Sequence, residues 1–435
     1  MPILMPQVEC ASREDIRTLQ LARLKRQVAY VYERVPWYRA KMDERGVRPE
    51  HIRSLADVRL LPFTDKQVMR DTYPFGLFAE PVDEAVRLHA SSGTTGKPVV
   101  VGYDRHDMDV WAECIMRLAS MAGVTARDRV QMAFGYGMFT GGFGLHQGLE
   151  RLGCLVIPAG SGSTERHVMM IEDFGSTVLV ATPTYALHIC EVGERLGHDW
   201  AHDTLRVGLF GGEPCTPALK AEIEARMHIT CTDNYGLTEV MGPGVSGECL
   251  GSRDHQHIAE DHFLWEVVDP KTGEPLPQGE EGELVLTTLT KRCIPVLRYR
   301  THDFTAVTCE PCTCGRTLAR MRKVRRRSDD MLIIRGTNVF PSQIEDVLSK
   351  IEGASTNYRL VIDNPSGMDR MTLMLEVKPD HFSDEVGAMD RFRDLVAMKL
   401  RETLQVSAVV KLVEPGSIER TTGKAKHVQD LRSQA

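Results

Sequence analysis

The most informative segment of this chain is Ala90-Ser91-Ser92-Gly93-Thr94-Thr95-Gly96-Lys97-Pro98. Its glycines let the backbone turn N–H groups toward an anion, while the hydroxyls and the lysine add donors and positive charge. The usual ATPase loop places four residues between its first glycine and the Gly-Lys pair, and Ser or Thr follows the lysine. Here two residues separate Gly93 from Gly96, and Pro98 follows Lys97. The segment therefore predicts a phosphate-binding loop of another geometry, with an ordinary surface loop as the alternative.

Further segments follow in a fixed order. They are Asp233-Asn234-Tyr235-Gly236-Leu237-Thr238-Glu239, Tyr299-Arg300-Thr301-His302-Asp303, the tract from Arg327 to Gly336, and Thr422-Gly423-Lys424-Ala425. In this order the segments resemble the consensus cores of the adenylate-forming superfamily, which includes acyl-coenzyme A ligases, luciferases and peptide-synthetase adenylation domains. The run from Phe134 to Gly142 and the tract from Met331 to Glu345 resemble phenylacetate-coenzyme A ligases and their aryl relatives. The resemblance spans nearly the whole chain.

The composition is that of an ordinary soluble protein. With 435 residues the chain can form two or three domains, and its apolar content of 42% and charged content of 26% are typical of globular proteins. A net charge of -7 gives no general attraction to nucleic acid or anionic membrane. No run of about eighteen apolar residues and no signal peptide is evident. The eleven cysteines are mostly scattered, so we expect a cytoplasmic protein without a disulfide framework.

Helix and strand patterns alternate after the glycine-rich segment. Strands are expected at residues 129–133, 155–158, 178–181 and 207–210, and helices at 107–122, 144–152, 164–174, 185–196 and 217–227. Continuous apolar strands alternating with helices predict an α/β fold, with buried parallel sheets flanked by helices. Residues 263–268 and 282–288 instead predict a small antiparallel, barrel-like sheet. Upstream, a helix is expected over residues 12–31, and Thr64 is expected to cap another short helix.

The last hundred residues predict a separate α+β module, with helices at 344–350 and 390–403 and strands at 358–362, 372–377 and 408–413. The resemblance implies that this module is mobile, with its pivot at Asp329. We therefore expect an N-terminal adenylation domain at 1–327 and a C-terminal domain at 328–435 that carries Lys424. Relatives usually have Gly directly before Arg327, whereas this chain has Arg326, which could restrict the hinge or contact coenzyme A phosphates.

The resemblance also implies roles for single residues. Thr238 would contact the α-phosphate of ATP, Glu239 would hold Mg2+, and Asp303 would bind the ribose hydroxyls. Lys424 would stabilise charge on the substrate carboxylate and α-phosphate during adenylation. The other residues expected around the nucleotide are Ser91, Ser92, Gly93, Thr94, Thr95, Gly96, Lys97, Gly211, Gly212, Glu213, Pro214, Asp233, Asn234, Tyr235, Gly236 and Arg327. Among them, Tyr235 would stack on the base and Arg327 would reach the ribose.

Aromatic residues among glycines suggest where the acyl group binds. Tyr136, Phe139 and Phe143 lie in a run rich in glycine, which leaves space for a flat ring. For any one of the three, packing in the protein core is an equally good interpretation.

A cysteine cluster suggests a metal site. Cys309-Glu-Pro-Cys312-Thr-Cys314 follows Cys249, His255 and His257, and cytoplasmic thiols at short spacing with imidazoles are typical of tetrahedral zinc. We expect Cys249, Cys312, Cys314 and either His255 or His257 as ligands of a structural Zn2+, with Cys309 as a spare thiol and with no metal as the alternative. His262 is expected to serve the fold.

Together the segments predict an ATP- and Mg2+-dependent ligase. It would convert an aromatic or arylacetic acid to an acyl-adenylate and then to its coenzyme A thioester. One alternative loads the acyl group on the pantetheine of a carrier protein in trans, and another is a non-catalytic nucleotide-binding regulator. The resemblance allows a homodimer.

Overall fold

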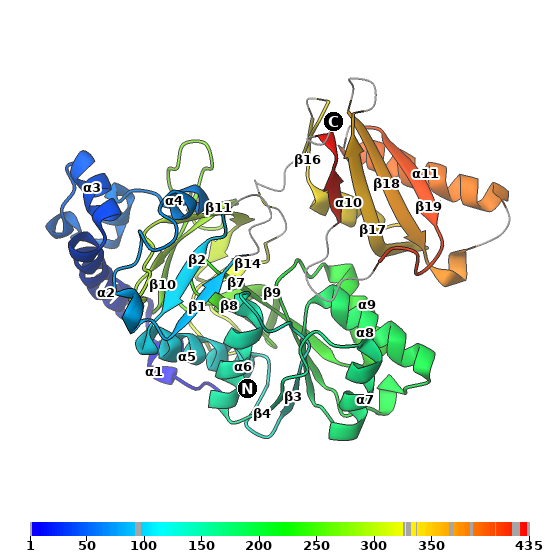
Figure 1. Ribbon diagram of the computed structural model, residues 1–435, viewed down its shortest axis with the longest axis horizontal. Coiled ribbons are helices and arrows are strands. Elements are labelled where there is room, and N and C mark those ends of the chain that lie inside the picture. Colours follow the sequence, from blue (N-terminus) through cyan, green and yellow to red (C-terminus); the bar gives the residue numbers. More distant parts are fainter. Residues whose placement is uncertain are drawn as a thin grey trace. The chain divides into compact units, whose positions relative to one another are not determined.

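The computed structural model describes residues 2–91, 97–324, 327, 332–335, 337–364, 369–382, 386–404, 406–419 and 427–432. The chain forms two compact units (Figure 1). The N-terminal unit comprises Met1–Cys215 and Ile223–Lys323, and the C-terminal unit comprises Thr216–Glu222 and Val324–Ala435. In the described ranges, no helix is long and apolar enough to cross a membrane.

A nine-stranded mixed sheet organises the N-terminal unit. Its strand order is β13-β14-β9-β8-β7-β6-β5-β3-β4. The strands are β3 (Arg129–Met132), β4 (Leu155–Ile157), β5 (Val178–Ala181), β6 (Val207–Phe210), β7 (Thr230–Leu237), β8 (Gly242–Cys249), β9 (Ser252–Ile258), β13 (Val307–Thr308) and β14 (Arg320–Arg322). Strands β3 to β7 pair in parallel, and β7, β8, β9, β14 and β13 pair antiparallel.

Helices cover the parallel part of this sheet. Helix α6 packs on β3 and β4, and α8 packs on β5 (Figure 1). Every residue of β5 and β6 is buried, as expected for strands covered on both faces. The helices of this part of the chain are α5 (Arg105–Met121), α6 (Thr140–Leu152), α7 (Thr164–Phe174), α8 (Pro183–Leu196) and α9 (Pro217–Met227), whose first residues belong to the C-terminal unit. The α/β prediction is confirmed, and the sheet continues into an antiparallel half that we did not expect.

Two smaller sheets complete the N-terminal unit. They are the pair β1 (Arg87–Ala90) and β2 (Val100–Tyr103), and the antiparallel sheet of β10 (Phe263–Val268), β11 (Gly282–Thr288) and β12 (Tyr299–Thr305). The remaining helices of this unit are α1 (Pro6–Glu9), α2 (Arg13–Arg34), α3 (Pro36–Glu44) and α4 (Lys66–Asp71), with 3-10 turns at Pro49–His51, Leu55–Leu60, Val82–Glu84 and Trp200–His202.

The cap of α4 corrects one prediction. We expected Thr64 to cap this helix, but the Val68 N–H donates to the carboxylate of Asp65 at 2.8 Å. Thr64 is fully buried and bonds instead to the chain leading into β12, donating its N–H to the Arg298 carbonyl at 3.1 Å and accepting the Arg300 N–H at 2.8 Å. Its backbone is therefore committed to a tertiary contact that the local sequence does not reveal.

The C-terminal unit is built on a four-stranded sheet of order β19-β18-β17-β20. Its elements are β15 (Leu332–Ile334), β16 (Thr337–Val339), α10 (Pro341–Leu348), β17 (Ala354–Asp363), β18 (Arg370–Val377), a 3-10 turn (Pro379–His381), α11 (Val386–Leu404), β19 (Ala408–Val413) and β20 (Val428–Asp430). Leu360 and Leu373 of the sheet and Val396 and Leu400 of α11 belong to one buried core. This unit therefore has a hydrophobic core of its own.

Candidate active site and metal cluster

The predicted phosphate loop is the connection of a β-hairpin. Its residues 92–96 lie outside the described residues, but both ends are described. Ser91 and Val99 close the hairpin, because the Ser91 N–H donates to the Val99 carbonyl at 3.0 Å and the Val99 N–H donates to the Ser91 hydroxyl at 3.1 Å. At the other end, the Lys97 ammonium lies 5.3 Å from the centre of the Tyr73 ring. Strands β1 and β2 therefore fix where the loop begins and ends.

The Gly-Gly-Glu-Pro segment follows the carboxyl end of β6. A side chain at Gly211 would bring its Cβ 2.9 Å from the Asn234 carbonyl oxygen, so the two backbones approach too closely for any residue larger than glycine. The Asn234 amide donates to the Phe210 carbonyl at 2.5 Å, and Glu213 accepts the Thr184 N–H at 2.8 Å. The turn predicted to lie against adenine is thus fixed to β7 on one side and to the start of α8 on the other.

Strands β7 and β12 bring two predicted nucleotide residues together. The Tyr235 hydroxyl donates to the Asp303 carboxylate at 2.5 Å, and Asp303 is buried with 1% of its surface exposed. A buried carboxylate that already accepts one hydroxyl hydrogen bond is suited to accept others, such as those of a ribose.

The Thr238-Glu239 pair lies in the connection between β7 and β8. Both residues are buried, and the Thr238 and Thr140 hydroxyls are 3.2 Å apart. The Lys66 ammonium lies 3.9 Å from a carboxylate oxygen of Glu239. Carboxylate oxygen is the ligand type that Mg2+ prefers, and the Glu239 carboxylate already faces one cation. Glu239 therefore fits the predicted metal role. Sequence reasoning missed Lys66, since a lysine in the first turn of a short helix carries no signal of a distant carboxylate.

The three predicted acyl-binding aromatics do not form a closed core. Tyr136 and Phe143 meet edge to face with ring centres 5.1 Å apart, while Phe139 is 47% exposed and Phe143 is 36% exposed. His146 holds the Tyr136 hydroxyl, with 2.9 Å between oxygen and Nδ1. Burial raises the pKa of Tyr136 to about 12, so it stays a neutral phenol. Partly exposed rings favour a binding wall over core packing.

Part of the predicted machinery falls in segments that the structure does not describe. Lys424 and the pivot Asp329 lie outside the described residues, as does Arg326. Arg327 is described and partly buried in the C-terminal unit. Of the basic residues that shortly precede Arg327, Lys323 is paired with Glu248 at 2.7 Å in the N-terminal unit.

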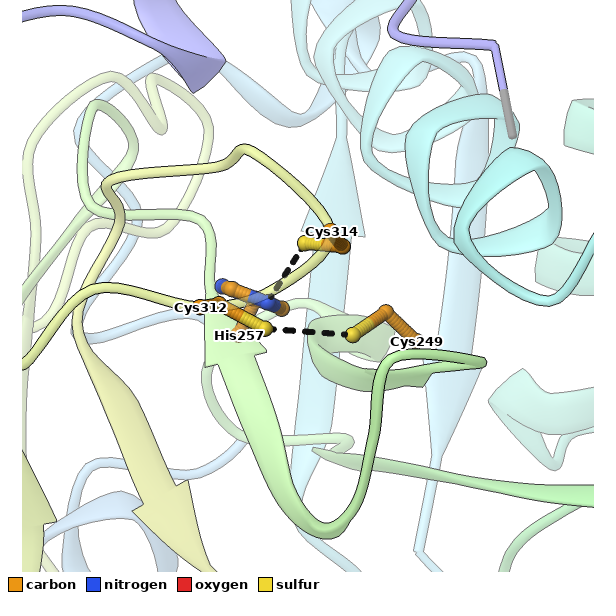
Figure 2. Close-up of side chains that lie close together, drawn as sticks. All are labelled: Cys249, His257, Cys312 and Cys314. Carbon is orange, nitrogen blue, oxygen red and sulfur yellow. Dashed lines mark hydrogen bonds between the residues drawn. The ribbon is translucent and has the colours of Figure 1, made fainter.

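The structure brings together four residues of the predicted metal site. Cys249 ends β8, His257 lies on β9, and Cys312 and Cys314 lie in the loop between β13 and β14 (Figure 2). Their ligand atoms all lie within 4.8 Å of one another. His255 is not in this group. The geometry therefore distinguishes between the two histidines, which the sequence could not do.

The spacing of these atoms fits a tetrahedral ion. The Cys249 and Cys312 sulfurs are 3.6 Å apart, and the Cys314 sulfur is 3.4 Å from His257 Nε2. Ligands at ordinary Zn–S and Zn–N distances define tetrahedron edges of about 3.8 Å and about 3.6 Å. The other ring nitrogen of His257 lies 3.3 Å from the Leu318 carbonyl, an outer contact typical of histidine ligands.

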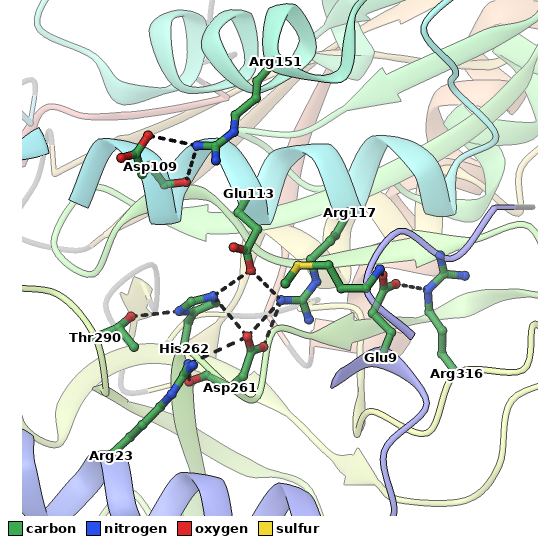
Figure 3. A network of polar contacts seen from close by, with 11 residues as sticks. Glu9, Arg23, Asp109, Glu113, Arg117, Arg151, Asp261, His262, Thr290 and Arg316 are labelled. Carbon is green, nitrogen blue, oxygen red and sulfur yellow. Dashed lines mark hydrogen bonds and ion pairs between the residues drawn. The ribbon is translucent and has the colours of Figure 1, made fainter. Parts of the chain in front are cut away.

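A second polar cluster is an ion-pair network (Figure 3). The Arg117 guanidinium lies 3.0 Å from both carboxylate oxygens of Asp261, and both side chains are buried. His262 Nε2 lies 3.1 Å from Asp261 and 3.2 Å from Glu113, and its Nδ1 contacts the Thr290 hydroxyl at 2.8 Å. Because an arginine already neutralises Asp261, this group ties α5 to the segment before β10 and is a poor cation site.

Known proteins resemble this chain in both of its units. The AMP-binding enzyme family matches residues 41–289, and the AMP-binding enzyme C-terminal domain matches residues 336–432. The phenylacetate-coenzyme A ligase of Aromatoleum evansii is 47% identical over 99% of this chain and 99% of its own length. That of Thermus thermophilus is 47% identical over 98% of this chain and 99% of its own length.

A solved structure is similar throughout. The crystal structure of 2-hydroxyisobutyryl-CoA ligase in the postadenylation state has a TM-score of 0.91 and 29% identity, and the match covers 99% of this chain and 92% of that one. The order of the sequence segments, the fold and these relatives agree: the chain belongs to the AMP-binding enzyme family, as a phenylacetate-coenzyme A ligase-like member of the adenylate-forming superfamily.

Proposed function

We propose that this protein activates an aromatic or arylacetic carboxylic acid. It is an AMP-forming acid–coenzyme A ligase. The substrate carboxylate attacks the α-phosphorus of ATP, and the bond to pyrophosphate breaks. The coenzyme A thiol then attacks the acyl carbon and AMP leaves. Near full-length likeness to phenylacetate-coenzyme A ligases and the exposed aromatic rings of Phe139 and Phe143 support a flat, aromatic acyl group.

The observation that carries the proposal is the arrangement around β7. This strand bears Tyr235, whose hydroxyl reaches Asp303 on β12, and it leads directly into Thr238 and Glu239. In the proposed role, Asp303 accepts hydrogen bonds from the ribose hydroxyls and the Thr238 hydroxyl donates to the α-phosphate. Such contacts align the two reactants, which is most of what this kind of phosphoryl chemistry requires.

Glu239 would hold Mg2+ at this site. The ion would neutralise charge on the phosphates and on the departing pyrophosphate. Lys424, on the C-terminal unit, is proposed to stabilise charge between the carboxylate and the α-phosphate during adenylation.

The cysteine and histidine cluster is proposed to bind a structural Zn2+. Cys249, His257, Cys312 and Cys314 would fill all four tetrahedral positions, which leaves none for a substrate. The ion would join the β8–β9 hairpin to the loop before β14, far along the chain from each other. A cytoplasmic location and a homodimer remain predictions from the sequence.

The test is ATP–pyrophosphate exchange with a panel of acids. We expect exchange that depends on an aromatic or arylacetic acid and fails with aliphatic acids of similar size. In a second step, coenzyme A is offered beside pantetheine-loaded carrier proteins. Transfer to a carrier protein alone would favour the carrier-loading alternative, and nucleotide binding without exchange would favour the regulator.

A further inference from the structure

Lys66 begins α4, and its backbone is fixed close to the proposed nucleotide site. Thr64 is bonded on both sides to the chain entering β12, the strand that carries Asp303. Asp65 caps α4 through the Val68 N–H. The position of Lys66 relative to β12 is therefore set by main-chain hydrogen bonds and a helix cap, and its side chain remains free to move.

The Lys66 ammonium lies beside the Glu239 carboxylate, the proposed Mg2+ ligand. Its nitrogen lies 3.9 Å from the nearer Glu239 oxygen, and the two side chains are 41% and 9% exposed respectively. An ion pair with so exposed a lysine is weak, worth at most about 1 kcal/mol. It neutralises the buried carboxylate and is easily broken when a better cation arrives.

The segment after α4 also lies beside Lys97, at the described end of the phosphate loop. Tyr73 follows this helix closely, and its ring lies under the Lys97 ammonium at 5.3 Å. The α4 segment is thus near Glu239 at one end and near Lys97 at the other. Lys66 and Lys97 thus place two ammonium groups, from separate parts of the chain, at the two ends of the α4 segment.

We infer that Lys66 exchanges partners during the reaction, pairing with Glu239 before the substrates bind and with the β- and γ-phosphates afterwards. This inference rests on the proposed function. Mg2+ and the ammonium compete for Glu239, so the ion alone binds weakly. The polyphosphate offers Lys66 a new, doubly charged partner, and metal and nucleotide therefore bind together. After adenylation, the same ammonium holds the departing pyrophosphate.

The test uses Lys66→Met and the matched control Lys41→Met. Lys41 is similarly exposed, at 42%, and is paired with Glu44 at 2.8 Å on α3, so both variants lose one positive charge and one lysine–glutamate ion pair. Mn2+ binding without nucleotide is measured by electron paramagnetic resonance, and the KM for pyrophosphate is measured by exchange.

For Lys66→Met we expect Mn2+ to bind more tightly, by up to about fivefold, because its competitor for Glu239 is gone. The KM for pyrophosphate should rise about tenfold or more, as a charge-assisted contact is lost. Lys66→Arg should restore most of the pyrophosphate affinity. Lys41→Met should change neither quantity.

The two readouts shift in opposite directions, which general damage to the fold cannot produce. Unchanged or weaker Mn2+ binding in Lys66→Met, or an unchanged KM for pyrophosphate, would overturn the inference. Failure of the wild-type protein to catalyse exchange with any acid would instead overturn the proposed function. The Mn2+ measurement needs no turnover, so it tests Lys66 in either case.

Discussion

Replacing Cys314 by serine should remove the metal and lower the stability of the N-terminal unit. The change deletes one of four ligand atoms that lie within 4.8 Å of one another, so a closed tetrahedral site becomes a three-ligand site. Cys154→Ser is the control. Cys154 is buried, with 8% of its surface exposed, and its thiol donates to the Thr125 carbonyl, so this variant loses a sulfur of the same unit without touching the cluster.

The expected loss of stability follows from the linkage between metal binding and folding. An ion present at about one hundred times its dissociation constant stabilises the folded state by about 2.7 kcal/mol. One kcal/mol shifts the melting temperature of a domain of 150–250 residues by about 2–4 °C, and the N-terminal unit is larger than that. We therefore expect Cys314→Ser to melt about 5 °C below the wild type in zinc, and the two to converge after chelation.

Elemental analysis and thermal melting are the assays. The wild type should carry close to one zinc per chain, and Cys154→Ser should keep it. Wild-type protein that holds no zinc after expression with ample metal would refute the reasoning. So would a Cys314→Ser variant that keeps its full zinc content and melting temperature.

Two further predictions concern charge. Burial acts to raise the pKa of Asp261, but His262 and Arg117 hold that pKa below its ordinary value. The ionised Asp261 carboxylate therefore stabilises the folded state above about pH 4, and this stabilisation is lost as the pH falls through the folded-state pKa. In urea unfolding, Asp261→Asn should lower the free energy of unfolding by about 3–5 kcal/mol at pH 7 and by progressively less in acid. A loss of stability that grows in acid would contradict the lowered pKa of Asp261. Lys424→Ala should slow adenylation by about two to four powers of ten and leave thioester formation from pre-made acyl-adenylate intact; equal loss in both half-reactions would refute a role in adenylation alone.

The α/β fold class could be predicted because the same local pattern, an apolar strand followed by an amphipathic helix, repeats along the chain. Buried strands such as β5 and β6 are continuous apolar runs between amphipathic helices, and this rhythm requires a parallel sheet. The antiparallel half of the same sheet was missed. Strands β8 and β9 carry glycines, acids and histidines that local propensity assigns to turns, and only pairing with β7 and β14 makes them strands.

The sequence singled out side chains that the structure brings together where a short segment carries its own chemistry. The thiols were recognisable from their spacing, yet the choice between His255 and His257 needed the register of β9. Thr64 and Lys66 show the limit most clearly. Their roles depend on β12 and on Glu239, and no local propensity encodes contacts with such distant partners.

The most direct test of the account is the product balance of one reaction. Purified protein is incubated with an arylacetic acid, ATP, Mg2+ and coenzyme A, and all products are quantified by liquid chromatography and mass spectrometry. We predict AMP, pyrophosphate and the acyl-coenzyme A thioester in equal amounts, with acyl-adenylate accumulating when coenzyme A is withheld. ADP and phosphate in place of AMP and pyrophosphate, or AMP formed without any thioester, would contradict it.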